Sequence, residues 1–263
     1  ITDLAYPLPI IIIAELLGIP VADQKQFKYW SDVIVSPARE PKKQAVRDMN
    51  AYFLSVVAQR REETREDLIS ALLTAEIDGE GGERLTNAEI MSFCRLLLVA
   101  GHETSTNLIG NALLTLDEHP EALEELRADP ALLPAAIEEV LRYRSPIQRL
   151  RRAATRDIQM GASLIKAGDI VSPILGAANR DPSQFPDAET FDIHRNPNRH
   201  IAFGYGIHFC IGSSLARLET RIALEVILQR FTSFRRVPGM QLKPVASAFV
   251  YGVKHLPMTY QVR

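Results

Sequence analysis

A cysteine near the end of the chain lies in a glycine-rich segment that could support thiolate chemistry. The segment reads Phe-Gly-Tyr-Gly-Ile-His-Phe-Cys-Ile-Gly over residues 203–212, with the cysteine at position 210. Its three glycines indicate a backbone that turns sharply or lies close to another group. Ser213 and Ser214 follow directly and are expected to cap a helix that begins near Leu215. Cys210 would then lie just ahead of a helix N-terminus, where the macrodipole and the free amides favour a thiolate.

Two kinds of role are open to such a cysteine. An arbitrary cysteine is most often a buried small hydrophobe without chemistry. The glycine pattern, the adjoining helix and His208 two residues earlier favour a ligand role here. The only other cysteine, Cys94, is distant in sequence, which argues against a disulfide framework or a cysteine-rich zinc site. A single thiolate between the apolar Phe203 and Ile211 suits an axial ligand of haem iron.

A second candidate site reads Ala-Gly-His-Glu-Thr-Ser over residues 100–105. Glycine in mid-helix costs about 1 kcal/mol relative to alanine, so Gly101 is expected to leave room for a ligand against the helix. Thr104 could donate a hydrogen bond there, with Glu103 beside it as a proton-exchanging group. Taken alone, a Glu-Thr pair more often faces solvent or bonds its own backbone, so both readings stay open. His102 is expected to be exposed or paired in the core, without a catalytic role.

The elements that must position these residues are mainly helical. A capping box at Thr86 and Glu89 predicts a helix of about 30 residues that ends before Pro120 and is about 45 Å long. A break at 37–41 and a glycine-rich loop at 78–83 separate earlier helices. The other predicted helices cover residues 7–17, 23–31, 42–64, 67–75, 121–128, 134–143 and 215–231. Short strands are predicted at 158–160, 164–165 and 170–175, an irregular segment at 179–201, and paired strands in the tail at 234–262. The pattern predicts one mainly α domain with a minor β part over residues 1–263.

Composition excludes several other classes of protein. The 263 residues carry a formal net charge of −2, with 46% hydrophobic and 24% charged residues, as in ordinary soluble globular proteins. No basic stripe is present, so we expect no nucleic-acid partner. The longest apolar run, residues 10–14, is far shorter than the roughly 20 residues that span a bilayer, so we expect no membrane partner. Two cysteines fit a reducing compartment, and we expect a cytoplasmic protein.

The segment 203–212 resembles the cysteine-ligand loop of the cytochrome P450 family, Phe-Gly-x-Gly-x-His-x-Cys-x-Gly, and fills every fixed position. The resemblance implies the C-terminal two-thirds of that fold, with a long central helix over haem b (iron protoporphyrin IX). Cys210 would be the proximal iron ligand, Phe203 would pack near the sulfur, and His208 would bond a haem propionate. The resemblance implies a haem-ligand loop over residues 196–212. We call this segment the cysteine loop. The family's N-terminal portion has no counterpart in the chain.

The segment 100–105 resembles the family's oxygen-activation motif, Ala-Gly-x-Glu/Asp-Thr-Thr/Ser. The resemblance implies that Ala100 and Gly101 contact the haem, that Thr104 hydrogen-bonds dioxygen and that Glu103 helps to relay protons. Arg152 resembles the family's propionate-binding arginine in the first strand. Its neighbour Arg151 leaves that choice open by one residue, although the strand register favours Arg152.

Glu139 and Arg142 stand three residues apart on one face of a predicted helix, a spacing that allows an ion pair. In the family such a pair joins an arginine from a later irregular segment, and Arg195 is the candidate here. The triad would support folding of the cysteine loop rather than chemistry. By position in the family, the substrate pocket would include Leu97, Val99, Ile147 and Val250.

The resemblance implies a bacterial-type soluble haem-thiolate monooxygenase that inserts one oxygen atom of O2 into a hydrophobic small molecule. The chain has no flavin-binding or iron–sulfur segment, so electrons would come from a separate ferredoxin-type or flavodoxin-type donor. Two alternatives remain open at this point. One is a haem-thiolate enzyme that uses peroxide directly, and the other is a truncated haem-binding fragment without turnover.

Overall fold

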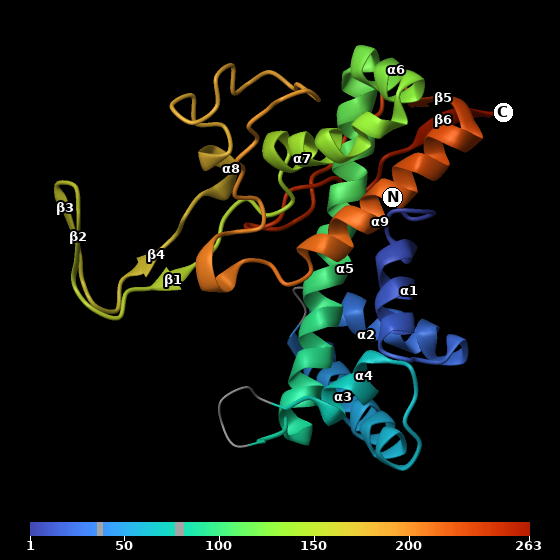
Figure 1. Ribbon diagram of the computed structural model, residues 1–263, viewed down its shortest axis with the longest axis vertical. Helices are drawn as coiled ribbons and strands as arrows, with labels where there is room; N and C mark the ends of the chain where they lie inside the picture. Colours follow the sequence, from blue (N-terminus) through green and yellow to red (C-terminus); the bar gives the residue numbers. More distant parts are fainter. Residues whose placement is uncertain (36–38, 77–81) are drawn as a thin grey trace. The chain divides into compact units, whose positions relative to one another are not determined.

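The structure, a computed structural model, describes residues 1–35, 39–76 and 82–263. These residues form two compact units, an N-terminal unit of Thr2–Glu103 and a C-terminal unit of Thr104–Arg263 together with Ile1. Helix α5 (Asn87–Glu118) is continuous through the boundary and contributes to both units (Figure 1). The prediction of a mainly α chain with a minor β part is confirmed.

The N-terminal unit consists of helices around an apolar core. It contains α1 (Pro7–Leu16), the short 3₁₀ helix η1 (Val21–Asp23), α2 (Gln24–Val35), α3 (Arg39–Glu62), α4 (Leu68–Thr74) and the first half of α5. Phe27, Met49, Phe53 and Ile69 are completely buried in this core. The helix predictions are confirmed to within a few residues, except that α2 continues to Val35.

The two segments predicted to separate the early helices lie partly outside the residues that the structure describes. Residues 36–38 of the break predicted at 37–41, and residues 77–81 around the loop predicted at 78–83, lie outside the described residues. The break does not extend to Pro41, because α3 already begins at Arg39. Proline is compatible with a first helical turn, where its missing N–H would have no intrahelical partner.

The N-terminus of α5 is the predicted capping box. Thr86 N–H donates to Glu89 Oε2 at 2.8 Å, and Glu89 N–H donates to Thr86 Oγ1 at 3.3 Å. The two bonds satisfy two amides that have no partner inside the helix. The helix then runs for 32 residues, close to the predicted length.

The C-terminal unit combines helices with three small antiparallel sheets. Its helices are the second half of α5, α6 (Pro120–Ala128), the 3₁₀ helix η2 (Pro130–Leu132), α7 (Leu133–Tyr143), α8 (Leu175–Ala178) and α9 (Ser213–Arg230). The strand pairs are β1 (Arg152–Ala153) with β4 (Ile170–Val171), β2 (Ile158–Met160) with β3 (Ser163–Ile165), and β5 (Phe231–Arg236) with β6 (Met258–Val262). A buried cluster that includes Leu116, Leu126, Val140 and Leu224 joins α5, α6, α7 and α9. Within this unit the β2–β3 hairpin extends away from the helices (Figure 1).

Two sequence predictions are wrong in this unit. The strand predicted at 170–175 ends at Val171, and Leu175 begins α8, because Pro173 interrupts the strand pairing. Helix α9 begins at Ser213, so Ser213 and Ser214 lie inside its first turn and Gly212 is the N-cap residue, without a side-chain cap. The backbone replaces the expected cap, since Ser213 N–H donates to Cys210 O at 3.2 Å.

No helix among the described residues combines the length and the apolar character needed to cross a membrane.

A buried ion pair links α3 to the start of α4. The Arg60 guanidinium lies against the Asp67 carboxylate, and its Nη2 donates to Gly18 O at 2.9 Å. Asp67 also caps α4, because its Oδ1 accepts the Ser70 N–H at 2.8 Å. Burial alone would raise the pKa of Asp67, but the hydrogen bonds from Ser70 and Arg60 outweigh burial and lower it. Gly18 is required here, since it has a φ of +67° and a Cβ would lie 2.1 Å from Asp67 Oδ2.

We expect Asp67→Asn to lower the free energy of unfolding by about 3 kcal/mol, because it keeps the capping oxygen but leaves the buried Arg60 charge without its counter-ion. Chemical denaturation followed by circular dichroism measures the loss. The control is Asp32→Asn, which breaks the exposed Lys28–Asp32 pair and should cost less than about 1 kcal/mol. Equal losses in the two variants would contradict the assignment.

Within the C-terminal unit, a buried acid connects α9 to α5. Glu219 is only 3% exposed, and its carboxyl is hydrogen-bonded to the Ser105 side chain. Its Oε2 has no hydrogen-bond partner among the described residues. Burial therefore dominates and raises the pKa of Glu219 from 4.5 to about 7, although the bond to Ser105 acts in the opposite direction.

This raised pKa predicts a pH-dependent stability. The unfolded chain loses the Glu219 proton near pH 4.5 and the folded chain only near pH 7, so folding stability should fall as pH rises through this window. Glu219→Gln removes this contribution, so the variant should gain stability relative to the wild type between pH 4.5 and pH 8. Denaturant unfolding at both pH values measures the difference, and a constant difference would refute the prediction.

Candidate functional site

The cysteine loop doubles back so that its cysteine lies beside its first phenylalanine. Cys210 N–H donates to Phe203 O at 2.9 Å, and Phe209 N–H donates to Gly206 O at 2.9 Å across the 3₁₀ turn η3 (Gly206–His208). Gly204 and Gly206 have φ values of +77° and +69°, which other residues rarely adopt. The turn thus explains two of the three glycines of the pattern. Cys210 is half-buried at the end of this turn.

Three apolar side chains of the loop are open to solvent. Ile207 is 98% exposed, Ile211 is 77% exposed and Phe209 is 51% exposed. Water is an unfavourable environment for large apolar side chains, so their exposure so close together in sequence indicates a segment that binds an apolar group. A flat macrocycle beside the Cys210 sulfur would cover part of it. The loop therefore fits a haem.

Among the described residues, no group of three or more His, Cys, Asp or Glu side chains could hold a metal ion. His208, the predicted propionate ligand, is exposed on the same loop. Phe203 packs partly against the core of the C-terminal unit, and its ring centroid lies 6.3 Å from that of Phe209.

Gly101 of the α5 motif lies close to a side chain of another helix. Gly101 leaves space for Ile13 of α1, because a Cβ at Gly101 would lie 2.8 Å from Ile13 Cδ1. The missing side chain of Gly101 thus allows close packing of α1 against α5 within the N-terminal unit. Haem contacts from Ala100 and Gly101 stay predictions.

His102 takes the second of its two expected environments, pairing in the core. It is 3% exposed, and its Nδ1 lies 2.8 Å from Ser31 Oγ of α2. Burial, followed by the nearby charge of Lys28, lowers the pKa of His102 to about 4, so the ring is neutral at pH 7. The pKa of the next residue, Glu103, is shifted upward, because burial disfavours its charged form. Thr104 follows on the same continuous helix.

The predicted triad residues lie in contact in the C-terminal unit. Arg142 donates to both Glu139 oxygens at 2.7 Å, and neither side chain is exposed. Arg195 Nε lies 3.3 Å from the same carboxylate. Arg142 also donates to the carbonyls of Asn179 and Ala188. The cluster thus connects α7 to the irregular segment that precedes the cysteine loop.

The two candidate propionate arginines have different neighbours. The Arg151 guanidinium lies over the Phe249 ring, 5.0 Å from its centroid. Arg152 is exposed at the start of β1, opposite Val171 of β4, and its Nη1 donates to Arg151 O at 2.9 Å. Arg152 stays the predicted propionate ligand.

The predicted pocket residues divide between the two units. Ile147 and Val250 face each other in an antiparallel bridge within the C-terminal unit. Leu97 and Val99 lie on the first half of α5 in the N-terminal unit, where Leu97 packs against that unit's core. Each pair therefore lies within a single unit, and the bridge places Ile147 opposite Val250.

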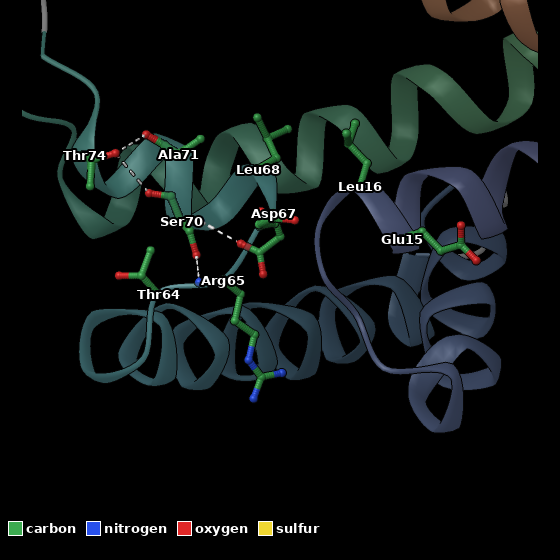
Figure 2. Close-up of a pocket in the computed structure, with 10 residues that line it drawn as sticks. Glu15, Leu16, Thr64, Arg65, Asp67, Leu68, Ser70, Ala71 and Thr74 are labelled. Atoms are coloured by element: carbon green, nitrogen blue, oxygen red, sulfur yellow. Dashed lines mark hydrogen bonds between the residues drawn. The ribbon is translucent and has the colours of Figure 1, made fainter.

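A pocket of about 440 Å³ lies in the N-terminal unit and contains none of the predicted site residues (Figure 2). Its polar groups are largely bonded to one another. Asp67 accepts the Ser70 N–H, and Ser70 Oγ accepts the Arg65 N–H at 3.0 Å. These bonds form the start of α4, which makes the pocket a structural feature of that turn.

Three residues near the loop were missed from the sequence. Glu138 accepts hydrogen bonds from His200 and Arg217, on opposite sides of Cys210 in the chain. Their wide separation in sequence leaves no local pattern to find. Glu219, also missed, had a usable signal, because it shares a helical face with the buried Ala223 and Ile227.

Comparison with known proteins agrees with this geometry. A family model described as Cytochrome P450 matches residues 12–259. The putative cytochrome P450 YjiB of Bacillus subtilis is 44% identical over 96% of this chain and 65% of its own length. The cytochrome P450 monooxygenase PikC of Streptomyces venezuelae is 42% identical over 98% of this chain and 62% of its own length.

Solved structures agree as well. The crystal structure of CYP109E1 from Bacillus megaterium in complex with corticosterone matches with a TM-score of 0.92 and 45% identity. The match covers 98% of this chain and 70% of that one. The chain spans about two thirds of the length of the curated relatives, 65% and 62% in the two cases above. The predicted fold is confirmed, and the chain belongs to the cytochrome P450 family.

Proposed function

We propose that the protein is a haem-thiolate monooxygenase that inserts one oxygen atom of O2 into a hydrophobic small molecule. The observation that carries the proposal is the cysteine loop, which combines the complete family pattern, exposed apolar side chains and a half-buried Cys210. The relative PikC is named a monooxygenase, which supports the same reaction class. The two units, joined by the continuous α5, are proposed to form one domain over residues 1–263.

The proposed cofactor is haem b, with Cys210 as its thiolate ligand. Bound haem would supply O2 binding and O–O cleavage, which electron donation from a thiolate favours. His208 and Arg152 would pair with the propionates, since both are exposed basic side chains. The apolar side chains of the loop, with Phe203 beneath them, would exclude water from the sulfur.

Glu103 and Thr104 are proposed to handle protons. Burial raises the pKa of Glu103, which brings its proton exchange closer to neutral pH. Thr104 can donate its hydroxyl proton and recover one from a neighbouring acid. His102 would take no part, because it is a neutral ring held by Ser31.

The substrate is proposed to be apolar, and the electrons to come from another protein. Leu97, Val99, Ile147 and Val250 are the proposed pocket residues, and all four are aliphatic. The CYP109E1 structure contains corticosterone, a steroid, which supports an apolar class for this family group. The proposed electron donor is a ferredoxin or a flavodoxin.

We expect the reduced protein under carbon monoxide to show the red-shifted Soret band of a thiolate ligand, and Cys210→Ala to abolish it. Absorption spectroscopy of the haem-loaded chain measures the band. Cys94→Ala is the matched control, since Cys94 is a buried core residue whose thiol pKa is raised to about 12 by burial. Haem binding without the shifted band in the wild type would refute the proposal.

Replacing Thr104 separates O2-dependent turnover from direct use of peroxide. We expect Thr104→Ala to lower product formation with O2 and a reductant by about 100-fold, the scale of a lost proton-transfer group. Peroxide-driven turnover should persist, because peroxide already carries its protons. Thr106→Ala, two residues along α5, is the control and should change neither rate. Equal loss in both assays would contradict a proton-transfer role, and no loss in either would favour the peroxide-dependent alternative.

A further inference from the structure

A single carboxylate of α7 contacts the chain on both sides of the proposed iron ligand. Glu138 Oε1 accepts Arg217 Nε at 2.6 Å, and Oε2 accepts Arg217 Nη2 at 2.8 Å. Glu138 Oε2 also lies 3.0 Å from His200 Nε2. His200 precedes Cys210 by ten residues and Arg217 follows it by seven. All three residues belong to the C-terminal unit.

The hydrogen bonds of His200 determine its tautomer. Its Nδ1 accepts the Ala202 N–H at 3.2 Å, so that nitrogen carries no proton. Nε2 is therefore the nitrogen that carries a proton, and it donates to Glu138. The His200 side chain is only 4% exposed, which keeps water from competing for these bonds. His200 thus fixes the backbone at Ala202, one residue before Phe203.

Arg217 reaches the loop from the other side. Its guanidinium lies over the Phe203 ring, 4.5 Å from the centroid, and forms a two-bond fork with Glu138. The carbonyl of Phe203 in turn accepts the Cys210 N–H at 2.9 Å. The contacts therefore form a continuous path from Glu138 through Arg217 and Phe203 to the backbone of Cys210.

The pair is more than an ordinary surface salt bridge. Burial opposes ionisation of Glu138, but the hydrogen bonds from Arg217 and His200 outweigh it and hold the pKa of Glu138 at about 2. The hydrogen bond to Glu138 raises the pKa of Arg217. By contrast, Arg221 and Glu225 on the exposed face of α9 are 3.7 Å apart, a separation without a hydrogen bond.

We propose that Glu138 is a positioning residue for the iron ligand, which holds the cysteine loop through His200 before Cys210 and through Arg217 after it. The inference rests on the proposed haem-thiolate function, because it assigns the contacts a purpose only if Cys210 binds iron. Glu138 itself touches neither the cofactor nor the substrate in this role. It acts by fixing the backbone of the cysteine loop on either side of Cys210.

The test compares Glu138→Gln and Arg217→Lys in the haem-loaded chain. Glutamine cannot accept from both partners with both terminal atoms, and lysine keeps the charge of Arg217 but cannot form the fork. In both variants we expect part of the red-shifted carbon monoxide band to convert to an unshifted band, and the ferric/ferrous midpoint potential to move from the wild-type value. These readouts report the sulfur–iron bond rather than general stability.

The matched control is Glu118→Gln, which removes a pair of similar exposure in the same unit. Arg144 Nη2 donates to Glu118 Oε2 at 2.6 Å, and the two side chains are 14% and 32% exposed, against 35% and 30% for Arg217 and Glu138. We expect a wild-type band and potential in this control at a comparable loss of thermal stability. Band and potential equal in Glu138→Gln and Glu118→Gln would overturn the proposal.

A second readout does not depend on haem. Amide hydrogen exchange over residues 196–212 should be about tenfold faster in Glu138→Gln than in Glu118→Gln, the scale of one lost charge-assisted hydrogen bond. If the wild-type chain shows no shifted band, the proposed function fails, and the exchange rates still decide whether Glu138 holds the loop. Equal exchange in the two variants would overturn that role as well.

Discussion

The guanidinium of Arg142 is completely buried, and a buried charge is tolerated only when its counter-charge and all its donors are paired. Glu139 provides the charge, and the remaining donors bond the carbonyls of Asn179, Ala188 and Thr190. These carbonyls belong to a segment with almost no regular secondary structure, so their bonds to Arg142 set its path. The cysteine loop continues directly from that segment. The position of Cys210 therefore depends on the buried Arg142 guanidinium, whose donors are all paired.

Two neighbouring carboxylates of α7 divide this work. Successive helical positions point about 100° apart, so Glu138 and Glu139 face different partners. Glu139 is fully buried and organises the irregular segment through Arg142 and Arg195, whereas Glu138 is partly exposed and contacts His200 and Arg217. Buried ion pairs contribute little net stability compared with apolar packing, but they specify one arrangement over others. Here the ion pairs of Glu138 and Glu139 specify the course of the chain on either side of Cys210.

The sequence predicts well where the cause is local. The capping box at Thr86 predicts the start of α5 to within a residue. Two glycines of the cysteine loop indicate its positive-φ turns. The sequence is less informative where contacts with other parts of the chain determine the local structure. The contact of Gly101 with Ile13 of another helix has no local signal, and α9 begins early because a backbone bond to Cys210 replaces the expected side-chain cap.

Site residues divide in the same way. The i, i+3 spacing of Glu139 and Arg142 is visible in the sequence, but the third member, Arg195, is reached only through family resemblance. Glu138 has partners that lie 62 and 79 residues away, so no local pattern reveals it. The pocket residues are harder still, since Leu97 and Ile147 belong to different compact units.

The β2–β3 hairpin has a practical consequence. Its side chains are exposed or partly exposed, its strands pair only with each other, and a Cβ built at Gly161 would meet nothing within 4 Å. Exposed loop tips with few contacts are the places where chains accept inserted peptides. An affinity tag or a surface-attachment peptide inserted at Gly161 would leave both apolar cores untouched. The protein could thus be immobilised on an electrode through a site that is separate from either terminus.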